Sequence, residues 1–217
     1  MITLPIVKKL KKKIHRDVAL LQDILVMEIY NHYSSAVIHG GTALWRCYGG
    51  NRFSGDVNVY LPLSMKNSNF ENFLDGMKEK GFTIDKFKQT NNSIFAKFSS
   101  LSATVRFEVL FKNVKNFVTK HFEMSDGNFI LVNTLSPEDM IKEKISAYLD
   151  RKKIRDIYDI FYLLKFVENR SEIRNELKKL VNNFVKPSDE KELKTLIISG
   201  SIPNIKKMLE VIKKWAK

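Results

Sequence analysis

The chain has 217 residues, of which 44% are hydrophobic, and a formal net charge of +13. Its length suits one domain or two small ones with a real core, and its composition is that of an ordinary soluble globular protein. The single cysteine, Cys47, excludes an intramolecular disulfide and a cysteine-based metal cluster. The positive charge predicts attraction to polyanions such as RNA or DNA, unless the lysines are spread evenly over every face.

The first predicted elements are one or two helices over residues 6–32, where apolar residues keep helical spacing at Ile14, Val18, Leu21, Leu25 and Ile29. Their start carries the basic stretch KKLKKK, residues 8–13, which suits either a solvated helix face or contact with an RNA backbone. The apolar segment that follows contains Gln22, Asp23 and Glu28. These polar residues exclude a clean signal-peptide core or a membrane span, so we expect a cytoplasmic protein without a membrane partner.

A mixed sheet is predicted between residues 36 and 112. A short strand over 36–39 leads into a Gly-Gly turn, and the next elements are a helix over 42–48, a strand over 56–61, a helix over 68–80 and strands near 82–88, 93–99 and 103–112. The last of these, SATVRFEVLF, alternates cleanly. Its apolar residues therefore face one way, and Arg106 and Glu108 face the other.

Helices are predicted for the rest of the chain after Asn133. The segment SPEDMIKEKISAYLD begins with Ser136, which suits an N-cap, and Pro137, which suits the first turn. We therefore expect an α+β protein, with a mixed-sheet domain over residues 1–133 and a helical domain over residues 134–217.

Candidate metal ligands stand in the strand that follows the stretch GGNRFSG, residues 49–55. Because side chains alternate along a strand, Asp56 and Asn58 point to one face. Glu108 would complete a metal triad with them if the two strands are neighbours; otherwise it is a solvated side chain. Phosphoryl or nucleotidyl transfer needs carboxylates of this kind to hold Mg²⁺.

The Gly-Gly pair before the helix at residue 42 is a candidate phosphate-binding turn. Gly40 and Gly41 let the backbone turn tightly and approach a phosphate, and the helix would direct free N–H groups toward it. The alternative is an ordinary turn. The ordered combination of Gly-Gly, a spacer and a D-x-N strand favours the phosphate-binding interpretation over an ordinary turn.

Two segments resemble the AbiEii/AbiGii toxin family of nucleotidyltransferase-like proteins. GGTALWRCYGGNRFSGDVNVYL matches the family's Gly-Gly-Thr-Ala-Leu followed by Arg-x-Ser-x-Asp-x-Asp. EKISAYLDRKKIRDIYDIFYLL matches its Glu-Lys helix followed by Arg-Asp-x-x-Asp. With VRFEVLF between them, these segments keep the family's order over residues 38–165.

The resemblance implies a minimal nucleotidyltransferase fold with a helical C-terminal domain. It also implies an activity: Mg²⁺-dependent transfer of a nucleoside monophosphate from an NTP to an acceptor, which is the 3′ end of tRNA for some members and a protein hydroxyl for others. Many members are toxins of toxin–antitoxin or abortive-infection systems, countered by a separately encoded antitoxin. The basic charge suits a tRNA acceptor.

The family motif assigns roles to residues of the sheet domain. Gly41 would support the turn near the triphosphate, and Ser54 would bind a phosphate oxygen. Asp56 falls at the first metal carboxylate, and Glu108 at the carboxylate of a later strand.

The second motif assigns roles to three residues of the helical domain. Lys144 matches the helix lysine that reaches the NTP phosphates. Asp156 and Asp159 match the acidic pair, of which one orients the lysine or the acceptor hydroxyl. Three residues apart on one helix, these carboxylates share a face at the edge of an apolar stripe, which suits a cleft or a domain interface. The alternative is a surface ion pair of little energetic weight.

Asn58 departs from the family pattern, which has an acid at this position. An amide oxygen can ligate Mg²⁺ but brings no negative charge, and hard cations bind chiefly through charged oxygens. Three accounts stay open: a natural variant in which Glu108 compensates, a degenerate pseudoenzyme that binds nucleotide or nucleic acid without catalysis, or an inactivating change made to tolerate a toxic protein. The sequence thus leaves open whether the chain is an active enzyme.

Overall fold

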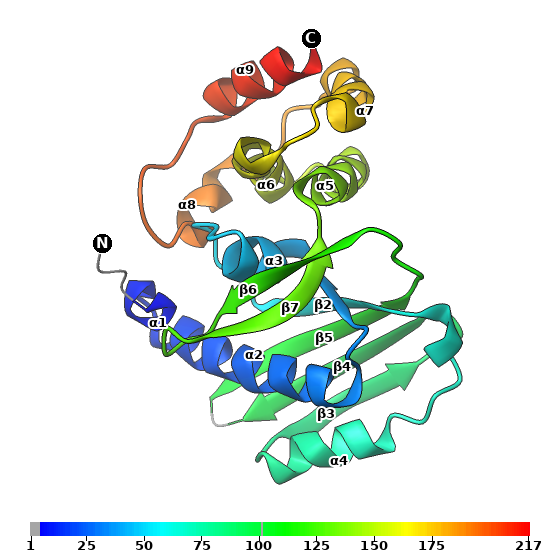
Figure 1. Cartoon of the computed structure of the whole chain (residues 1–217). Coiled ribbons are helices and arrows are strands. Elements are labelled where there is room, and N and C mark those ends of the chain that lie inside the picture. Colours follow the sequence, from blue (N-terminus) through cyan, green and yellow to red (C-terminus); the bar gives the residue numbers. More distant parts are fainter. Residues whose placement is uncertain (1–4, 101) are drawn as a thin grey trace. The chain divides into compact units, whose positions relative to one another are not determined.

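A computed structural model of the chain describes residues 5–100 and 102–217. It contains two compact units (Figure 1). The first comprises residues 1–49 and 53–134, and the second comprises residues 50–52 and 135–217. Residues 1–4 and 101 of the expected mixed-sheet domain lie outside the described part of the chain.

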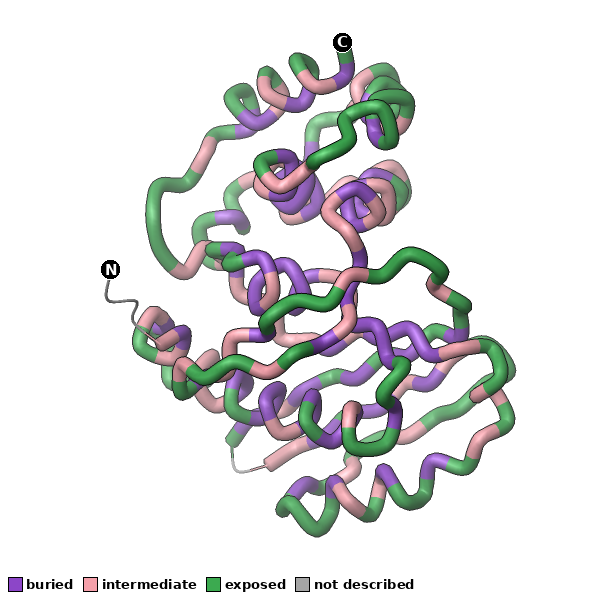
Figure 2. The backbone as a smooth tube through the Cα atoms, viewed as in Figure 1, coloured by how far each residue is buried: buried purple, intermediate pink, exposed green. Residues whose placement is uncertain are grey.

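The first unit is built on a mixed sheet that has seven strands in the described part of the chain. Their order is β3 (Thr83–Gln89), β4 (Ser93–Ser100), β5 (Ala103–Phe111), β2 (Asp56–Leu61), β1 (Val37–His39), β7 (Phe129–Leu135) and β6 (Phe117–Glu123). Strand β2 runs parallel to β5 and antiparallel to β1. It is therefore a central strand, largely buried, whereas β3 and β6 at the edges are mostly exposed (Figure 2).

One face of this sheet is covered by helices α2 (Lys13–His32) and α4 (Glu71–Glu79). The ring of Phe73 in α4 contacts Phe98 of β4 and Phe107 of β5, all with at most 1% of their surface exposed. On the other face, Arg106 and Glu108 of β5 are exposed. The alternating pattern of β5 thus separates a packed face from an open polar face.

Helix α3 (Gly40–Cys47) follows β1 directly and is joined to α2 by a buried ion pair. The guanidinium of Arg46 donates to the Asp23 carboxylate, and Asp23 also accepts the backbone N–H of Ser125 at 2.8 Å. Trp45 and Phe122 place their rings 4.7 and 4.8 Å from the guanidinium carbon. A short helix α1 (Ile6–Lys9) precedes α2.

The second unit is helical. Its elements are α5 (Pro137–Arg151), α6 (Ile154–Leu163), α7 (Ser171–Asn182), α8 (Leu193–Leu196) and α9 (Ile205–Ala216). Helix α5 packs on α6 and α7, and α9 packs on α6 and α7. Residues 50–52 join this unit through Asn51, whose carbonyl accepts the backbone N–H of Ile198 at 2.7 Å. Single 3₁₀ turns occur at Leu63–Met65, Leu164–Phe166 and Glu190–Glu192.

The start of α6 is held by Asp189, which is distant in the sequence. Its carboxylate accepts the backbone N–H of Ile154 at 2.9 Å and lies 3.5 Å from the Lys153 ammonium. Asp189 thereby supplies the acceptor that a capping side chain normally provides. Helix α5 begins as predicted, because the Ser136 side chain accepts the N–H of Asp139 and Pro137 is its first residue.

Most predicted elements of the sheet and helices are confirmed, although α4 begins at Glu71 rather than residue 68 and further differences occur elsewhere. Strands β6 and β7 were not predicted, α3 begins at Gly40 rather than residue 42, and Ile14, assigned to the apolar side of its helix, is 44% exposed. No helix within residues 5–100 and 102–217 combines the length and the apolar character needed to cross a bilayer.

Replacing Asp23 by Asn is expected to destabilise the protein by about 3–5 kcal/mol, because the buried Arg46 would lose the carboxylate to which it donates. The free energy of unfolding from urea denaturation measures this change. A loss below about 1 kcal/mol would contradict a stabilising role for the pair.

Candidate functional site

The polar residues of β2 lie on the open face of the sheet. Val57 and Val59 are fully buried, whereas Asp56 and Asn58 are partly exposed. In the register of the parallel strands, Asp56 lies beside Arg106 and Asn58 beside Glu108. Since β2 and β5 are neighbours, all four side chains share one face.

The Asp56 carboxylate is bound on both oxygens by Arg106. The guanidinium donates from Nε to Oδ1 and from Nη2 to Oδ2, each at 2.7 Å. These bonds, with a further contribution from the charge of Glu108, raise the pKa of Arg106. Such a two-bond pair is the strongest geometry for arginine and a carboxylate.

Asn58 packs against the start of α3. His39, the residue before Gly40, pairs with Asn58 across β1 and β2. Gly40 has φ +76°, and a Cβ at this position would come within 2.9 Å of the Asn58 amide nitrogen. Gly40 is therefore required both by its backbone conformation and by the closeness of Asn58.

Two buried side chains, Gln22 and Thr42, fix the position of the loop that leads into β2. The Gln22 amide donates to the Ser54 carbonyl at 2.8 Å, and the Thr42 hydroxyl donates to the Asp56 carbonyl. Both Gln22 and Thr42 are fully buried. Helices α2 and α3 thus set the position of Ser54 and of the first residue of β2.

The side chains on this face offer oxygen ligands, the type that hard divalent cations prefer. Asp56 and Glu108 offer carboxylates from neighbouring strands, and Asn58 between them offers an amide oxygen, all of the type that Mg²⁺ accepts. Because position 58 carries an amide, this group contains two carboxylates, those of Asp56 and Glu108. The described residues hold no cluster of three His, Cys, Asp or Glu side chains placed to bind a metal.

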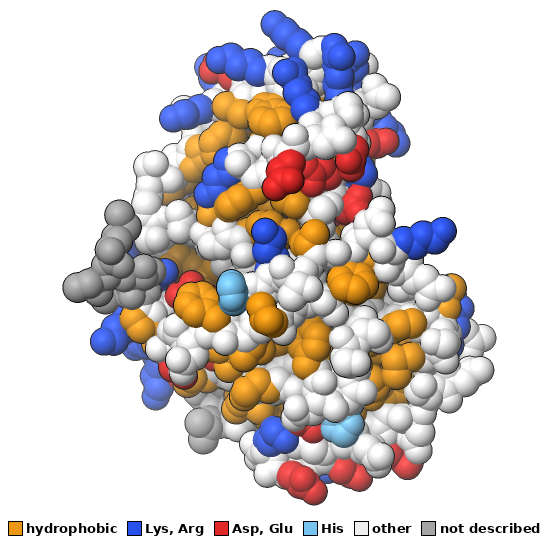
Figure 3. All heavy atoms as spheres, viewed as in Figure 1, with side chains coloured by type: hydrophobic (Ala, Val, Ile, Leu, Met, Phe, Trp, Pro, Cys, Tyr) orange, Lys and Arg blue, Asp and Glu red, His pale blue; other side chains and the backbone are white. Residues whose placement is uncertain are grey.

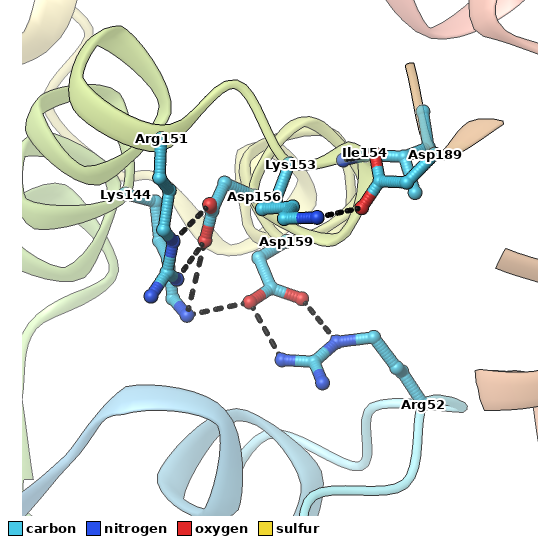
Figure 4. Close-up of polar contacts among 8 residues, drawn as sticks. All are labelled: Arg52, Lys144, Arg151, Lys153, Ile154, Asp156, Asp159 and Asp189. Carbon is cyan, nitrogen blue, oxygen red and sulfur yellow. Dashed lines mark hydrogen bonds and ion pairs between the residues drawn. The ribbon is translucent and has the colours of Figure 1, made fainter. Parts of the chain in front are cut away.

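A second polar group lies in the helical unit, around Lys144 of α5 (Figure 4). Its ammonium is 2.7 Å from Oδ2 of Asp159 and 3.8 Å from Oδ1 of Asp156, both on α6. The two carboxylates have no exposed surface, and the Lys144 side chain is only 10% exposed. Asp156 and Asp159 are therefore buried rather than surface residues.

Two arginines complete this group. Arg52 donates from Nε and Nη2 to the two oxygens of Asp159 at 2.7 and 2.8 Å (Figure 4). Arg151 binds Asp156 in the same two-bond manner at 2.8 and 2.7 Å. Three cations thus surround two buried carboxylates.

The charge of Asp159 is maintained by its neighbours. Burial alone would raise its pKa, but the positive charges of Arg52 and Lys144 outweigh burial and hold the pKa below its ordinary value of 3.8. Asp159 likewise outweighs the burial of Arg52, whose pKa is raised. Each charge is therefore stable in the interior because the other is present.

The structure distributes the predicted site residues between the two units. The members in the sheet unit are Gly40, Gly41, Ser54, Asp56, Asn58 and Glu108, and those in the helical unit are Lys144, Asp156 and Asp159. Sequence reasoning did not assign Arg52, Arg106 or Arg151. Arg52 had a signal, since it is the arginine of the quoted Arg-x-Ser-x-Asp pattern, and Arg106 had one in its place on the polar face of β5.

A sequence model of the nucleotidyl transferase AbiEii toxins, of type IV toxin–antitoxin systems, matches residues 23–215. The chain belongs to this family. The match includes both polar groups, and it confirms the predicted relationship to nucleotidyltransferase toxins. No curated protein sequence gives a significant match.

Two solved structures resemble the chain over nearly its whole length. JHP933 from Helicobacter pylori has a TM-score of 0.66 and 18% identity, and the match covers 94% of this chain and 91% of JHP933. The nucleotidyltransferase toxin MenT4 from Mycobacterium tuberculosis has a TM-score of 0.63 and 14% identity, with 93% and 82% covered. At these identities the likeness establishes a shared fold, which confirms the predicted nucleotidyltransferase architecture.

Replacing Gly40 by Ala is expected to destabilise the AbiEii-family chain by roughly 1–2 kcal/mol, because alanine is strained at positive φ and its methyl group meets Asn58. The matched control is Gly55→Ala in the following loop, where the new Cβ would make only an ordinary contact, at 3.7 Å from Phe53. Urea denaturation measures both. Equal effects of the two substitutions would contradict the assigned strain.

Replacing Asp159 by Asn is expected to destabilise the protein by about 3–5 kcal/mol, because Arg52 and Lys144 would lose their buried counter-ion. Asp75→Asn is the control, since its pair with Lys78 is on the surface and its side chain is 62% exposed. Because the pKa of Asp159 is lowered by folding, its contribution is present above the unfolded value and is lost as the pH falls. The difference in unfolding free energy between the unaltered chain and the Asp159→Asn variant should therefore shrink below about pH 4. A difference that stays constant to pH 2 would contradict this charge-based account.

Proposed function

We propose that the chain is a toxin that transfers a nucleoside monophosphate from an NTP to tRNA and is countered by a cognate antitoxin protein. Membership of the AbiEii family supports transfer as the reaction class and the antitoxin as the partner. Such a transfer depends on positioning and on electrostatic stabilisation of the phosphates more than on covalent chemistry by the protein. NTP and tRNA are both cytoplasmic, which is where we expect the protein to act.

The observation that carries this proposal is the environment of Lys144. Its ammonium is fixed by Asp159 at 2.7 Å, and the side chain keeps 10% of its surface exposed. A lysine held in one place, yet not sealed from solvent, is suited to contact the phosphates of an NTP. Asp159 orients the lysine in this role, Arg52 maintains the charge of Asp159, and Asp156 contributes a second carboxylate.

The sheet unit is proposed to supply the metal and phosphate contacts. Asp56, Asn58 and Glu108 would hold Mg²⁺, which supplies charge stabilisation to the reacting phosphates when it is bound. Gly40 and Gly41 allow the backbone to approach a phosphate, and Ser54 contributes a hydroxyl. The hydrogen bond from the buried Gln22 side chain to the Ser54 carbonyl keeps this loop in a fixed position.

The distribution of basic residues supports a polyanionic acceptor. Figure 3 shows Lys and Arg side chains gathered over α7 and α9. The exposed cations of these two helices are Arg174, Lys178, Lys179, Lys206, Lys207, Lys213 and Lys214. Contacts between such side chains and phosphates give sequence-independent affinity that weakens as the salt concentration rises.

A second candidate function is binding without catalysis. The amide at Asn58 in place of the family's acid favours it, because it removes one negative charge from the proposed metal site. In this case the chain keeps the fold to bind nucleotide, tRNA or an antitoxin. One comparison of rates distinguishes the two functions.

We expect Asn58→Asp to increase transfer of label from NTPs to total tRNA by about 100-fold or more, because the acid restores charge where the transition state needs it. Each of the four labelled NTPs is incubated with Mg²⁺, tRNA and either the unaltered chain or the Asn58→Asp variant. Label that comigrates with tRNA on a denaturing gel measures the transfer.

The control is the Asp56→Asn, Asn58→Asp double variant, which has the same total charge as the unaltered chain but lacks the first carboxylate. It should be inactive. A folded Asn58→Asp variant that labels no tRNA with any NTP would exclude transfer to this acceptor and leave binding without catalysis. Equal rates for Asn58→Asp and the unaltered chain would show that the amide does not impair the site.

A further inference from the structure

Arg106 occupies the positions around Asp56 that a metal ion would use. Both oxygens of the carboxylate accept a guanidinium N–H at 2.7 Å. The Asp56 side chain is 29% exposed and that of Arg106 is 54% exposed, so the pair borders solvent on the open face of the sheet. A divalent cation that binds Asp56 must share or take these oxygens.

The position of Arg106 follows from the strand register and not from a flexible side chain reaching across the surface. Parallel pairing of β2 and β5 puts Arg106 directly beside Asp56 and Glu108 directly beside Asn58. The four residues carry formal charges of −1, +1, −1 and 0 for Asp56, Arg106, Glu108 and Asn58, a sum of −1. An acid at position 58 would make this sum −2 and attract a cation more strongly.

We propose that Arg106 is a built-in competitor for the divalent cation at Asp56. The guanidinium neutralises this carboxylate when no metal is bound, and it leaves Asp56 when the metal enters. The proposal rests on the assignment of Asp56 as a metal ligand within the proposed function. It gives Arg106 a role in lowering metal affinity, in addition to the lower affinity that the Asn58 amide causes.

The expected size of the effect follows from the exposure of the pair. Ion pairs that border solvent contribute little, and their loss changes an equilibrium by up to about fivefold. Removing the charge of Arg106 also removes repulsion between the cation and the guanidinium, which acts in the same direction. We therefore expect Arg106→Gln to tighten divalent binding by about two- to fivefold, and Asn58→Asp to tighten it by about tenfold.

The test measures Mn²⁺ binding to the full chain without NTP or tRNA, from the electron paramagnetic resonance signal of free Mn²⁺. The matched control is Lys97→Gln. Lys97 lies directly across from Arg106 on β4, it is also a half-exposed cation, and its partner is Asp85 at 3.7 Å rather than Asp56. Both substitutions remove one positive charge from the same face. A difference in Mn²⁺ affinity between the two variants therefore reports competition at Asp56 and not a general change of charge.

The proposal is supported if Arg106→Gln binds Mn²⁺ at least twofold more tightly than Lys97→Gln, and if Arg106→Gln combined with Asp56→Asn loses this gain. It is overturned if Arg106→Gln and Lys97→Gln bind equally, if Arg106→Gln binds more weakly than the unaltered chain, or if no variant binds Mn²⁺ at millimolar concentration. Circular dichroism spectra and thermal unfolding establish that each variant is folded.

The Mn²⁺-binding test can succeed or fail separately from the test of nucleotidyl transfer. If tRNA is not labelled but Arg106→Gln gains affinity through Asp56, the competitor role stands and the acceptor proposal fails. If label is transferred but the Asp56→Asn change leaves Mn²⁺ binding unaltered, transfer stands and the competitor role fails.

Discussion

The carboxylate of Asp159 has no exposed surface, and its charge is stable only because Arg52 and Lys144 bind it. An unpaired charge at this depth would cost several kcal/mol, so the segments that carry these three residues must pack together. Residues 50–52 consequently belong to the helical unit although they interrupt the sheet unit in the sequence. Ser54 and Asp56 follow within four residues of Arg52 in the sequence, but they belong to the sheet unit.

The polar face of the sheet has a different charge balance. There Asp56 is neutralised by Arg106 at the border of solvent, and position 58 carries an amide rather than an acid. In the helical unit, by contrast, three cations hold two carboxylates that have no exposed surface. The first arrangement can exchange its cation for another at little cost, whereas the second cannot, because its carboxylates would be left without partners.

The sequence predicts the strand with the clearest local pattern, β5, and it does not predict two of the strands that lack clean alternation. Strand β5 alternates between buried and exposed residues along its whole length, and it was recognised. Strands β6 and β7 were missed because they expose large apolar side chains: Phe117 is 47%, Phe129 59% and Leu131 65% exposed. Ile14 keeps the helical spacing of the apolar residues, yet it is exposed because it lies in the first turn of α2, where every residue is exposed or partly exposed.

The sequence by itself determined the strand with Asp56 and Asn58, the start of α5 at Ser136, and the motifs that placed Lys144, Asp156 and Asp159 in one family pattern. Only the tertiary structure decided which charges meet. Arg52 binds a carboxylate 107 residues away, and Arg106 binds one 50 residues away. Local periodicity shows which face a side chain occupies, but its partner depends on strand register and helix packing, which arise from contacts between distant segments.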